Sequence, residues 1–204
     1  IGSPVADLFL GIKYLVSRSG TPVPSHYLTE AAQFGEVTVL QNSCYLPLGF
    51  LAEPTLADLD FTKNSGDFSF QNKLLQQATG LTGKVWQTVS DADLKVLPEN
   101  VTIRSRNNYG LCSYETGTGG GKITYQYTVS QSGYLAVLLD LGARNDFTVL
   151  VNGATRYSDS LSLPQIAAVG TVQAGDVVEI RMDCDDGEAK QMTVTAAFLD
   201  YALF

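Results

Sequence analysis

The feature that most constrains the fold is the strict alternation of apolar and polar residues in the second half of the chain. Residues 123–130 read ITYQYTVS, in which every odd position is apolar and every even position is polar. Because successive side chains of a β-strand point to opposite faces of a sheet, this pattern predicts a strand with one buried face. Residues 178–184 and 192–198 repeat the alternation, and the apolar run at 133–139 predicts a fully buried strand.

Turn residues separate these candidate strands at short intervals. Asn152-Gly153 is a strong signal for a two-residue hairpin turn, and Ala174-Gly175 predicts a second turn. With further candidates at 101–106 and 111–115, we count about eight short strands. The sequence therefore predicts an antiparallel, jelly-roll-like β-sandwich of the galactose-binding-like kind over residues 85–204.

The residues before this region mix helix signals with β signals. Pro4 fits the first turn of a helix, where its missing N–H costs nothing, and Ser3 is placed to cap that helix. Short strands are predicted at 13–17, 38–42 and 48–52.

A second amphipathic helix is predicted to begin near Phe70. Asp67 or Ser69 can cap its start, and Gly80 lies just past its end. The resulting fold class is α+β and mostly β. We expect a small α/β unit with two helices over residues 1–84, followed by the sandwich.

The charge balance restricts the partners of this chain. Acidic residues outnumber basic ones by 21 to 13, for a net charge of −8. We therefore expect no nucleic-acid partner, since phosphate binding needs a basic patch, and no attachment to anionic lipid.

No apolar run reaches the roughly 20 residues that span a bilayer. Because the chain opens at Ile1 within predicted structure, we expect a piece of a longer protein. Three widely spaced cysteines predict free thiols: Cys44, Cys112 and Cys184.

Signals for catalysis or metal binding are weak. The glycine-rich stretch at 116–121 lacks the Lys-Ser/Thr pair and the helix of a phosphate-binding loop, so it predicts an inter-strand loop. The acidic run at 183–188 predicts a solvated loop, with a calcium site as the open alternative. His26, the single histidine, has no nucleophile motif near it in the sequence. We predict no catalytic residue, no metal site and no cofactor, while a hydrolase that pairs two of the 21 acids stays open.

Aromatic residues are the remaining candidates for ligand binding. Flat rings match the apolar faces of sugars, so exposed rings can form a stacking platform. The alternative is that these rings fill the core and the sheet faces of the sandwich. The candidates are Trp86, Tyr109, Tyr114 and Tyr157, with Tyr134 beside them.

Three stretches of the first unit form an ordered set. They are LGIKYLVS at 10–17, VLQN at 39–42 followed by LPLGFL at 46–51, and FQNKLL at 70–75 followed by TG at 79–80. In order and spacing they resemble the C-terminal extracytoplasmic region of the bacterial YfhO-like membrane proteins, which show LGVKYhhS, hyxNxxhLPxhF and xFxxQNxLhxxhTG. The resemblance covers roughly residues 8–81 and departs at Gly49, where the family usually carries a basic or small polar residue.

The resemblance implies a parent protein with many membrane helices that acts in sugar transfer from a lipid-linked donor. In membrane glycosyltransferases of that kind, the acidic catalytic residue lies in an early loop that has no counterpart here. The resemblance therefore implies no catalytic residue in this chain. The matched residues are expected to build the fold; they are Lys13, Tyr14, Asn42, Pro47, Gln71 and Asn72.

The leading functional hypothesis is a soluble domain at the extracytoplasmic face of the bacterial cell membrane. It has a non-catalytic accessory or glycan-positioning role in cell-envelope sugar transfer. Its expected partners are a cell-envelope glycan and the membrane helices of the parent chain. The alternatives are an independent carbohydrate-binding module and a structural spacer.

Overall fold

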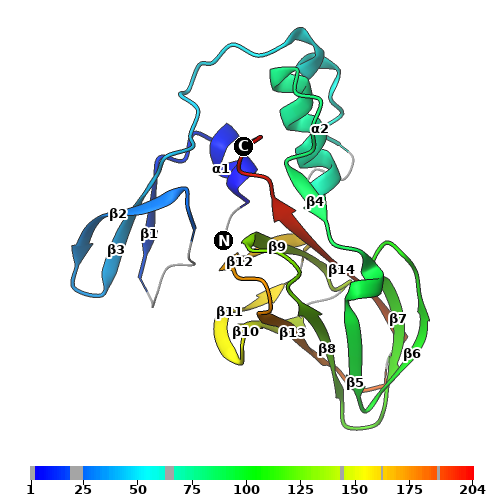
Figure 1. The fold of residues 1–204 in the computed structure, drawn as a ribbon. Helices are drawn as coiled ribbons and strands as arrows, with labels where there is room; N and C mark the ends of the chain where they lie inside the picture. Colours follow the sequence, from blue (N-terminus) through cyan, green and yellow to red (C-terminus); the bar gives the residue numbers. More distant parts are fainter. Residues whose placement is uncertain (1–2, 19–24, 63–66, 143–144, 162, 188) are drawn as a thin grey trace.

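The computed structural model describes residues 3–18, 25–62, 67–142, 145–161, 163–187 and 189–204 (Figure 1). Its helices are α1 (Pro4–Phe9) and α2 (Phe68–Thr79), with 3-10 turns η1 (Pro54–Asp58) and η2 (Asp91–Asp93). Its strands are β1 (Tyr14–Ser17), β2 (Leu28–Phe34), β3 (Val37–Asn42), β4 (Trp86–Thr88), β5 (Lys95–Glu99), β6 (Val101–Arg106), β7 (Leu111–Thr116), β8 (Gly121–Thr128), β9 (Gly133–Asp140), β10 (Asn145–Val151), β11 (Ala154–Leu161), β12 (Gln165–Val172), β13 (Val177–Cys184) and β14 (Ala189–Leu199).

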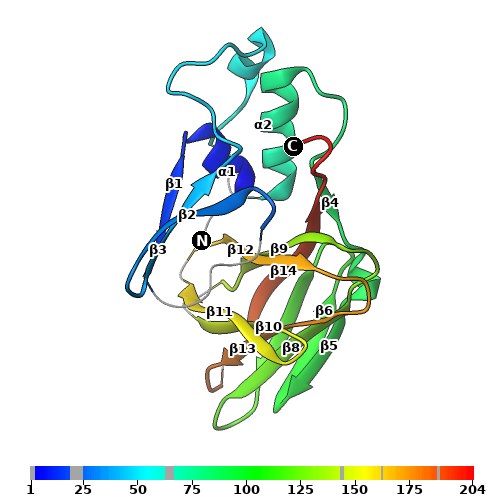
Figure 2. The same cartoon turned by 60° about the vertical axis from the view of Figure 1, so that its left-hand side comes forward.

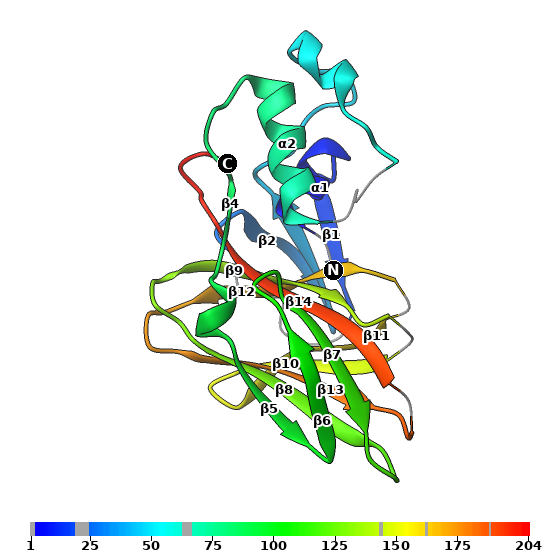
Figure 3. The same ribbon diagram turned by 90° about the vertical axis from the view of Figure 1, so that its right-hand side faces the viewer.

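Strands β5 to β14 form the predicted mostly-β sandwich. One sheet has the order β11-β10-β13-β8-β5, and the other has the order β12-β9-β14-β7-β6, with β4 added against β14. From β5 to β14, the β6–β7 and β10–β11 connections stay within one sheet. Each of the remaining connections crosses from one sheet to the other, in the jelly-roll manner. Figure 3 shows the two layers.

The period-two pattern correctly identified the inward faces of these strands. Ile123 and Tyr125 of β8 and Ile180 and Met182 of β13 all lie in one apolar cluster between the sheets. The two-residue turn at Asn152-Gly153 is confirmed, because β10 and β11 pair directly on either side of it. Both turn residues have positive φ, 50° and 78°, as this hairpin type requires.

Three sandwich-side strands, β4, β5 and β12, were not predicted individually from the sequence. In β12, with the sequence QIAAVGTV, alanine and glycine weaken the strand signal. The edge strand β5 contains Pro98, which cannot donate to a neighbouring strand and so weakens the sequence signal. Strand β4 has only three residues and extends the second sheet by pairing Trp86 with Leu199. The sandwich therefore holds more strands than the eight expected.

A separate three-stranded sheet, β1-β3-β2, belongs to the N-terminal unit. Strand β2, with the sequence LTEAAQF, was missed because alanine and glutamate have low strand propensity. The strand expected at 48–52 is wrong: these residues pair with no strand and run as an irregular segment after Pro47.

Both predicted helices are present, but their caps differ in detail. Asp67 caps α2 by accepting from the Phe70 amide, and Gly80 ends the helix in the left-handed conformation at φ 72°. The Ser3 side chain does not cap α1; it donates instead to the Gln71 side chain of α2.

A second apolar cluster joins the N-terminal unit to the sandwich. Helices α1 and α2 lie over the outer face of the second sheet, at the end where β4 and β14 meet (Figures 1 and 2). Val5, Phe68 and Leu75 pack there against Trp86 and Tyr134. The two parts of the chain therefore share a core.

Candidate functional site

The N-terminal unit covers only part of the outer face of the second sheet. Tyr134 and Ala197 on that face are buried under the helices. Farther along β9 and β14 the helices end, and Leu138, Thr193 and Thr195 stay half-buried. Leu138 and Thr195 are direct cross-strand partners, so they form the floor of the uncovered region.

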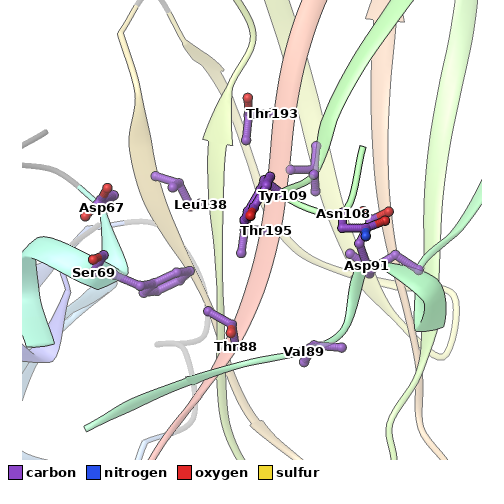
Figure 4. A pocket seen from close by; sticks show the side chains of 14 residues that line it. Asp67, Ser69, Thr88, Val89, Asp91, Asn108, Tyr109, Leu138, Thr193 and Thr195 are labelled. Atoms are coloured by element: carbon purple, nitrogen blue, oxygen red, sulfur yellow. The ribbon is translucent and has the colours of Figure 1, made fainter. Parts of the chain in front are cut away.

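A pocket of about 310 Å³ occupies this uncovered region (Figure 4). It is bounded by the first turn of α2, by β4 and η2, by the loop before β7 and by the floor strands. The lining residues are Asp67, Phe68, Ser69, Thr88, Val89, Asp91, Leu94, Asn108, Tyr109, Gly110, Leu138, Thr193, Val194 and Thr195.

The loop between β6 and β7 brings an aromatic ring to the pocket. The Asn107 side chain accepts hydrogen bonds from the Tyr109 amide at 2.9 Å and from the Leu111 amide at 3.1 Å, which fixes the loop. The Gly110 carbonyl accepts from the Val194 amide of β14 at 3.1 Å. Tyr109 is thereby held over the pocket with its side chain 83% exposed, open to a ligand.

Gly110 is required for this loop to approach the sheet. Its φ is +80°, and an added Cβ would lie 2.2 Å from the Val194 carbonyl oxygen. A residue with a side chain would therefore strain the backbone and push the loop, with Tyr109, away from β14.

The two carboxylates of the lining are both engaged in the fold. Asp91 forms an ion pair with Arg106 at 2.8 Å, and both side chains are mostly shielded from solvent. Arg106 also donates to the Asp91 carbonyl at 2.7 Å. Asp67 is occupied by the cap of α2. The other polar groups of the lining are neutral: they are the hydroxyls of Ser69, Thr88, Thr193 and Thr195 and the amide of Asn108.

The pocket can therefore offer neutral donors and acceptors beside an exposed ring. That combination suits a neutral, polyhydroxylated ligand, because each hydroxyl can pair with one side chain while the ring covers an apolar face. Within the described part of the chain, no group of three or more His, Cys, Asp or Glu residues is arranged to hold a metal. In the acidic loop, Asp183 and Asp185 lie near the amines of Lys122 and Lys190 at 3.9 and 3.6 Å.

Gln71 and Asn72, two residues of the family motifs, fasten α2 to the sandwich. The Asn72 side chain accepts from the Trp86 amide at 2.7 Å and donates to the Trp86 carbonyl at 2.9 Å, as a neighbouring strand would. The Gln71 side chain accepts from the Trp86 indole at 2.8 Å and from the Ser3 hydroxyl. Both side chains are buried, so these bonds replace water that the groups lose on folding.

Asn42 plays the same part within the N-terminal sheet. It is fully buried, and its side chain donates to the Ile12 carbonyl at 2.9 Å and accepts from the Cys44 amide at 2.8 Å. Lys13, which precedes β1, and Tyr14, the first residue of β1, are both exposed, and Pro47 is exposed in the segment after β3. None of the six motif residues lines the pocket.

The aromatic candidates are not gathered into one platform. Trp86 and Tyr114 are each 1% exposed, so a ligand cannot stack on them in this structure. Tyr157 is half-buried on β11 against Phe147. Only Tyr109 of the four lines the pocket, and the sequence pattern gave no reason to group it with Thr88, Thr193 and Thr195.

Comparison with solved structures finds β-sandwich modules of low similarity. One is a family 35 carbohydrate-binding module from Clostridium thermocellum, at 17% identity and a TM-score of 0.38, covering 56% of this chain and 98% of that one. A second is the family 35 module from Paenibacillus barcinonensis, at 13% identity and a TM-score of 0.39, covering 56% of this chain and 99% of that one. A third is a β-(1,4)-mannanase from Podospora anserina that includes such a module, at 16% identity and a TM-score of 0.36, covering 56% of this chain and 28% of that one.

No match was found among curated proteins. Among the described residues, no helix has the length and apolar character needed to cross a membrane. A family model described as bacterial membrane protein YfhO matches residues 2–202, well beyond the motif stretches of the N-terminal unit. The chain therefore belongs to the YfhO family of bacterial membrane proteins.

Proposed function

We propose that this chain is an extracytoplasmic, non-catalytic part of a membrane protein of cell-envelope sugar transfer, and that it positions a glycan. The observation that carries the proposal is the pocket beside Tyr109, whose free polar groups are neutral hydroxyls and an amide. Such a lining can pair with the hydroxyls of a neutral sugar without the cost of stripping water from a bare charge.

The engaged carboxylates support a role in binding. A glycoside hydrolase needs two carboxyl groups free to reach a bound sugar as acid and as base or nucleophile. In this pocket Asp91 is paired with Arg106, and Asp67 is held by the backbone of α2. Each of these carboxylates has one oxygen in a structural contact, which holds its side chain to the fold.

Titration of the chain with neutral oligosaccharides from the bacterial envelope, followed by calorimetry or NMR, tests this function. We expect weak, saturable binding that Tyr109→Ala lowers about fivefold, because the ring contact is worth about 1 kcal/mol. Tyr109→Phe should bind nearly as well, since it keeps the ring. Tyr14→Ala is a matched control, because Tyr14 is also exposed but lies on the N-terminal sheet.

The possible outcomes test the glycan-binding role and the Tyr109 pocket separately. An absence of binding to every neutral envelope sugar at millimolar concentration would remove the glycan role and leave a spacer. Binding that Tyr109→Ala and Thr195→Val both leave unchanged would keep the role and exclude this pocket.

A further inference from the structure

The segment after β3 exposes large apolar side chains at the end of the molecule opposite the sandwich (Figures 1 and 2). Leu48 and Leu51 are fully exposed, at 105% and 102%, and Leu10 is 71% exposed. We call residues 45–51 together with Leu10 the leucine loop. Burial of a leucine side chain is strongly favourable, and Leu48 and Leu51 gain none of it within the chain.

Contacts with α1 hold the leucine loop in place. The Leu46 amide donates to the Leu8 carbonyl at 3.0 Å. The Phe50 ring packs edge-on against Phe9, with 5.8 Å between ring centroids. Leu10 caps the same helix and is also exposed. Exposed large apolar side chains gathered on adjoining segments indicate an interaction site in a folded protein.

The leucine loop contains no charged residue, although the chain as a whole carries −8. Lys13 precedes β1 at the end of that strand from which the loop departs, whereas Arg18 lies beyond the other end, where Ser17 pairs with Thr38. Glu53, the first acid after the loop, turns toward the end of α2, where its side chain lies near Gly80.

Lys13 is flanked by two tyrosines at the base of the loop. Its ammonium lies 5.5 Å from the centroid of the Tyr14 ring and 5.4 Å from that of Tyr45. Amphipathic rings concentrate at the headgroup level of bilayers, and a lysine stem can reach from apolar surroundings to a phosphate. The loop thus combines exposed leucines with a cation that lies near two tyrosine rings, the residue types that a bilayer surface accommodates.

We propose that the leucine loop inserts into the headgroup region of an anionic phospholipid bilayer, with Lys13 at the phosphates. Membership of a membrane protein family places the chain near such a surface. Because the loop contains no acidic residue, a chain of net charge −8 can present an uncharged apolar surface to the lipid, with Lys13 beside it. This orientation leaves the Tyr109 pocket away from the lipid, because the pocket lies on the sandwich sheet.

Flotation with vesicles of phosphatidylglycerol and phosphatidylcholine in a 1:3 ratio tests the proposal. We expect the chain to float with the vesicles, and Leu48→Asp with Leu51→Asp to lower partitioning about 100-fold, because two apolar contacts are lost. Lys13→Gln should lower it about fivefold, and only with phosphatidylglycerol present. Leu163→Asp is the matched control, since Leu163 is 76% exposed but lies between β11 and β12.

Three outcomes would overturn the proposal. The first is wild-type chain that fails to float with the vesicles. The second is equal loss with Leu163→Asp, which would show non-specific apolar adsorption. The third is a concentration-dependent dimer that the double substitution abolishes, which would assign the loop to a second copy of the chain. The substituted side chains are fully exposed, so thermal unfolding should be unchanged and misfolding can be checked directly.

Discussion

The sandwich and the N-terminal unit are stabilised in opposite ways. Between the sandwich sheets lies an apolar cluster drawn from both faces. The N-terminal unit contributes six of the eight buried polar or charged residues among the described positions, and nine of the twelve exposed large hydrophobic ones. The sandwich thus holds together mainly by burying apolar surface, while the N-terminal unit adds specific side-chain hydrogen bonds to a smaller apolar cluster and leaves other apolar surface outside. The second arrangement is expected where a surface is kept for a partner.

The strongest test of this contrast removes the amide that joins the two regions. Asn72→Ala would leave the Trp86 amide and carbonyl without the partners that Asn72 supplies, in a buried place. We expect a loss of about 3 kcal/mol in the free energy of unfolding, measured by urea denaturation. Lys73→Ala, an exposed neighbour on α2, should change it by less than about 0.5 kcal/mol. Equal effects of the two substitutions would show that the hydrogen bonds between Asn72 and Trp86 do not stabilise the junction of the two regions.

Within the sandwich, the equivalent test uses a glycine. Gly110→Ala combines an unfavourable φ with a close approach to the Val194 carbonyl, and we expect a loss of about 2 kcal/mol together with weaker glycan binding. Gly119→Ala separates the two causes, because Gly119 has φ +90° but nothing within 4 Å of the added Cβ. It should cost about 1 kcal/mol. A loss at Gly110 no larger than that at Gly119 would show that the loop can move off β14 freely.

The same contrast explains what the sequence could and could not predict. The period of two identified the inward faces of β8 and β13, because every second side chain there meets one apolar layer. It could not identify the pocket, because Thr193 and Thr195 have the same outward pattern as Ala197, and only the position of α2 decides which of them is covered. Motif resemblance singled out Gln71 and Asn72, but Trp86, to which both side chains are hydrogen-bonded, lies outside the motif stretches.

A pH-dependent test addresses Asp7, a carboxylate of the N-terminal unit whose pKa is strongly shifted. Burial raises the pKa of Asp7 from 3.8 to about 6. The folded state therefore binds this proton more tightly than the unfolded state, so its contribution to stability is present below about pH 4 and is lost as the pH rises to about 6. Asp7→Asn should raise the free energy of unfolding by about 1 to 2 kcal/mol at pH 7 and leave it unchanged at pH 4. Asp58→Asn, on the exposed turn η1, is the control. A gain that persists at pH 4 would point to packing as its cause.

The smallest expected effect concerns the thiols, which should report the same division of the molecule. Cys112 and Cys184 are buried in the sandwich, and burial raises the pKa of each thiol, so both should resist a thiol reagent in the folded protein. Cys44 is half-exposed beside the leucine loop and should react first. Cys44→Ser should therefore abolish the fast phase of modification at pH 8 and change stability by less than about 0.5 kcal/mol. Fast reaction of more than one thiol in folded protein would mean that the sandwich core opens as readily as the N-terminal unit.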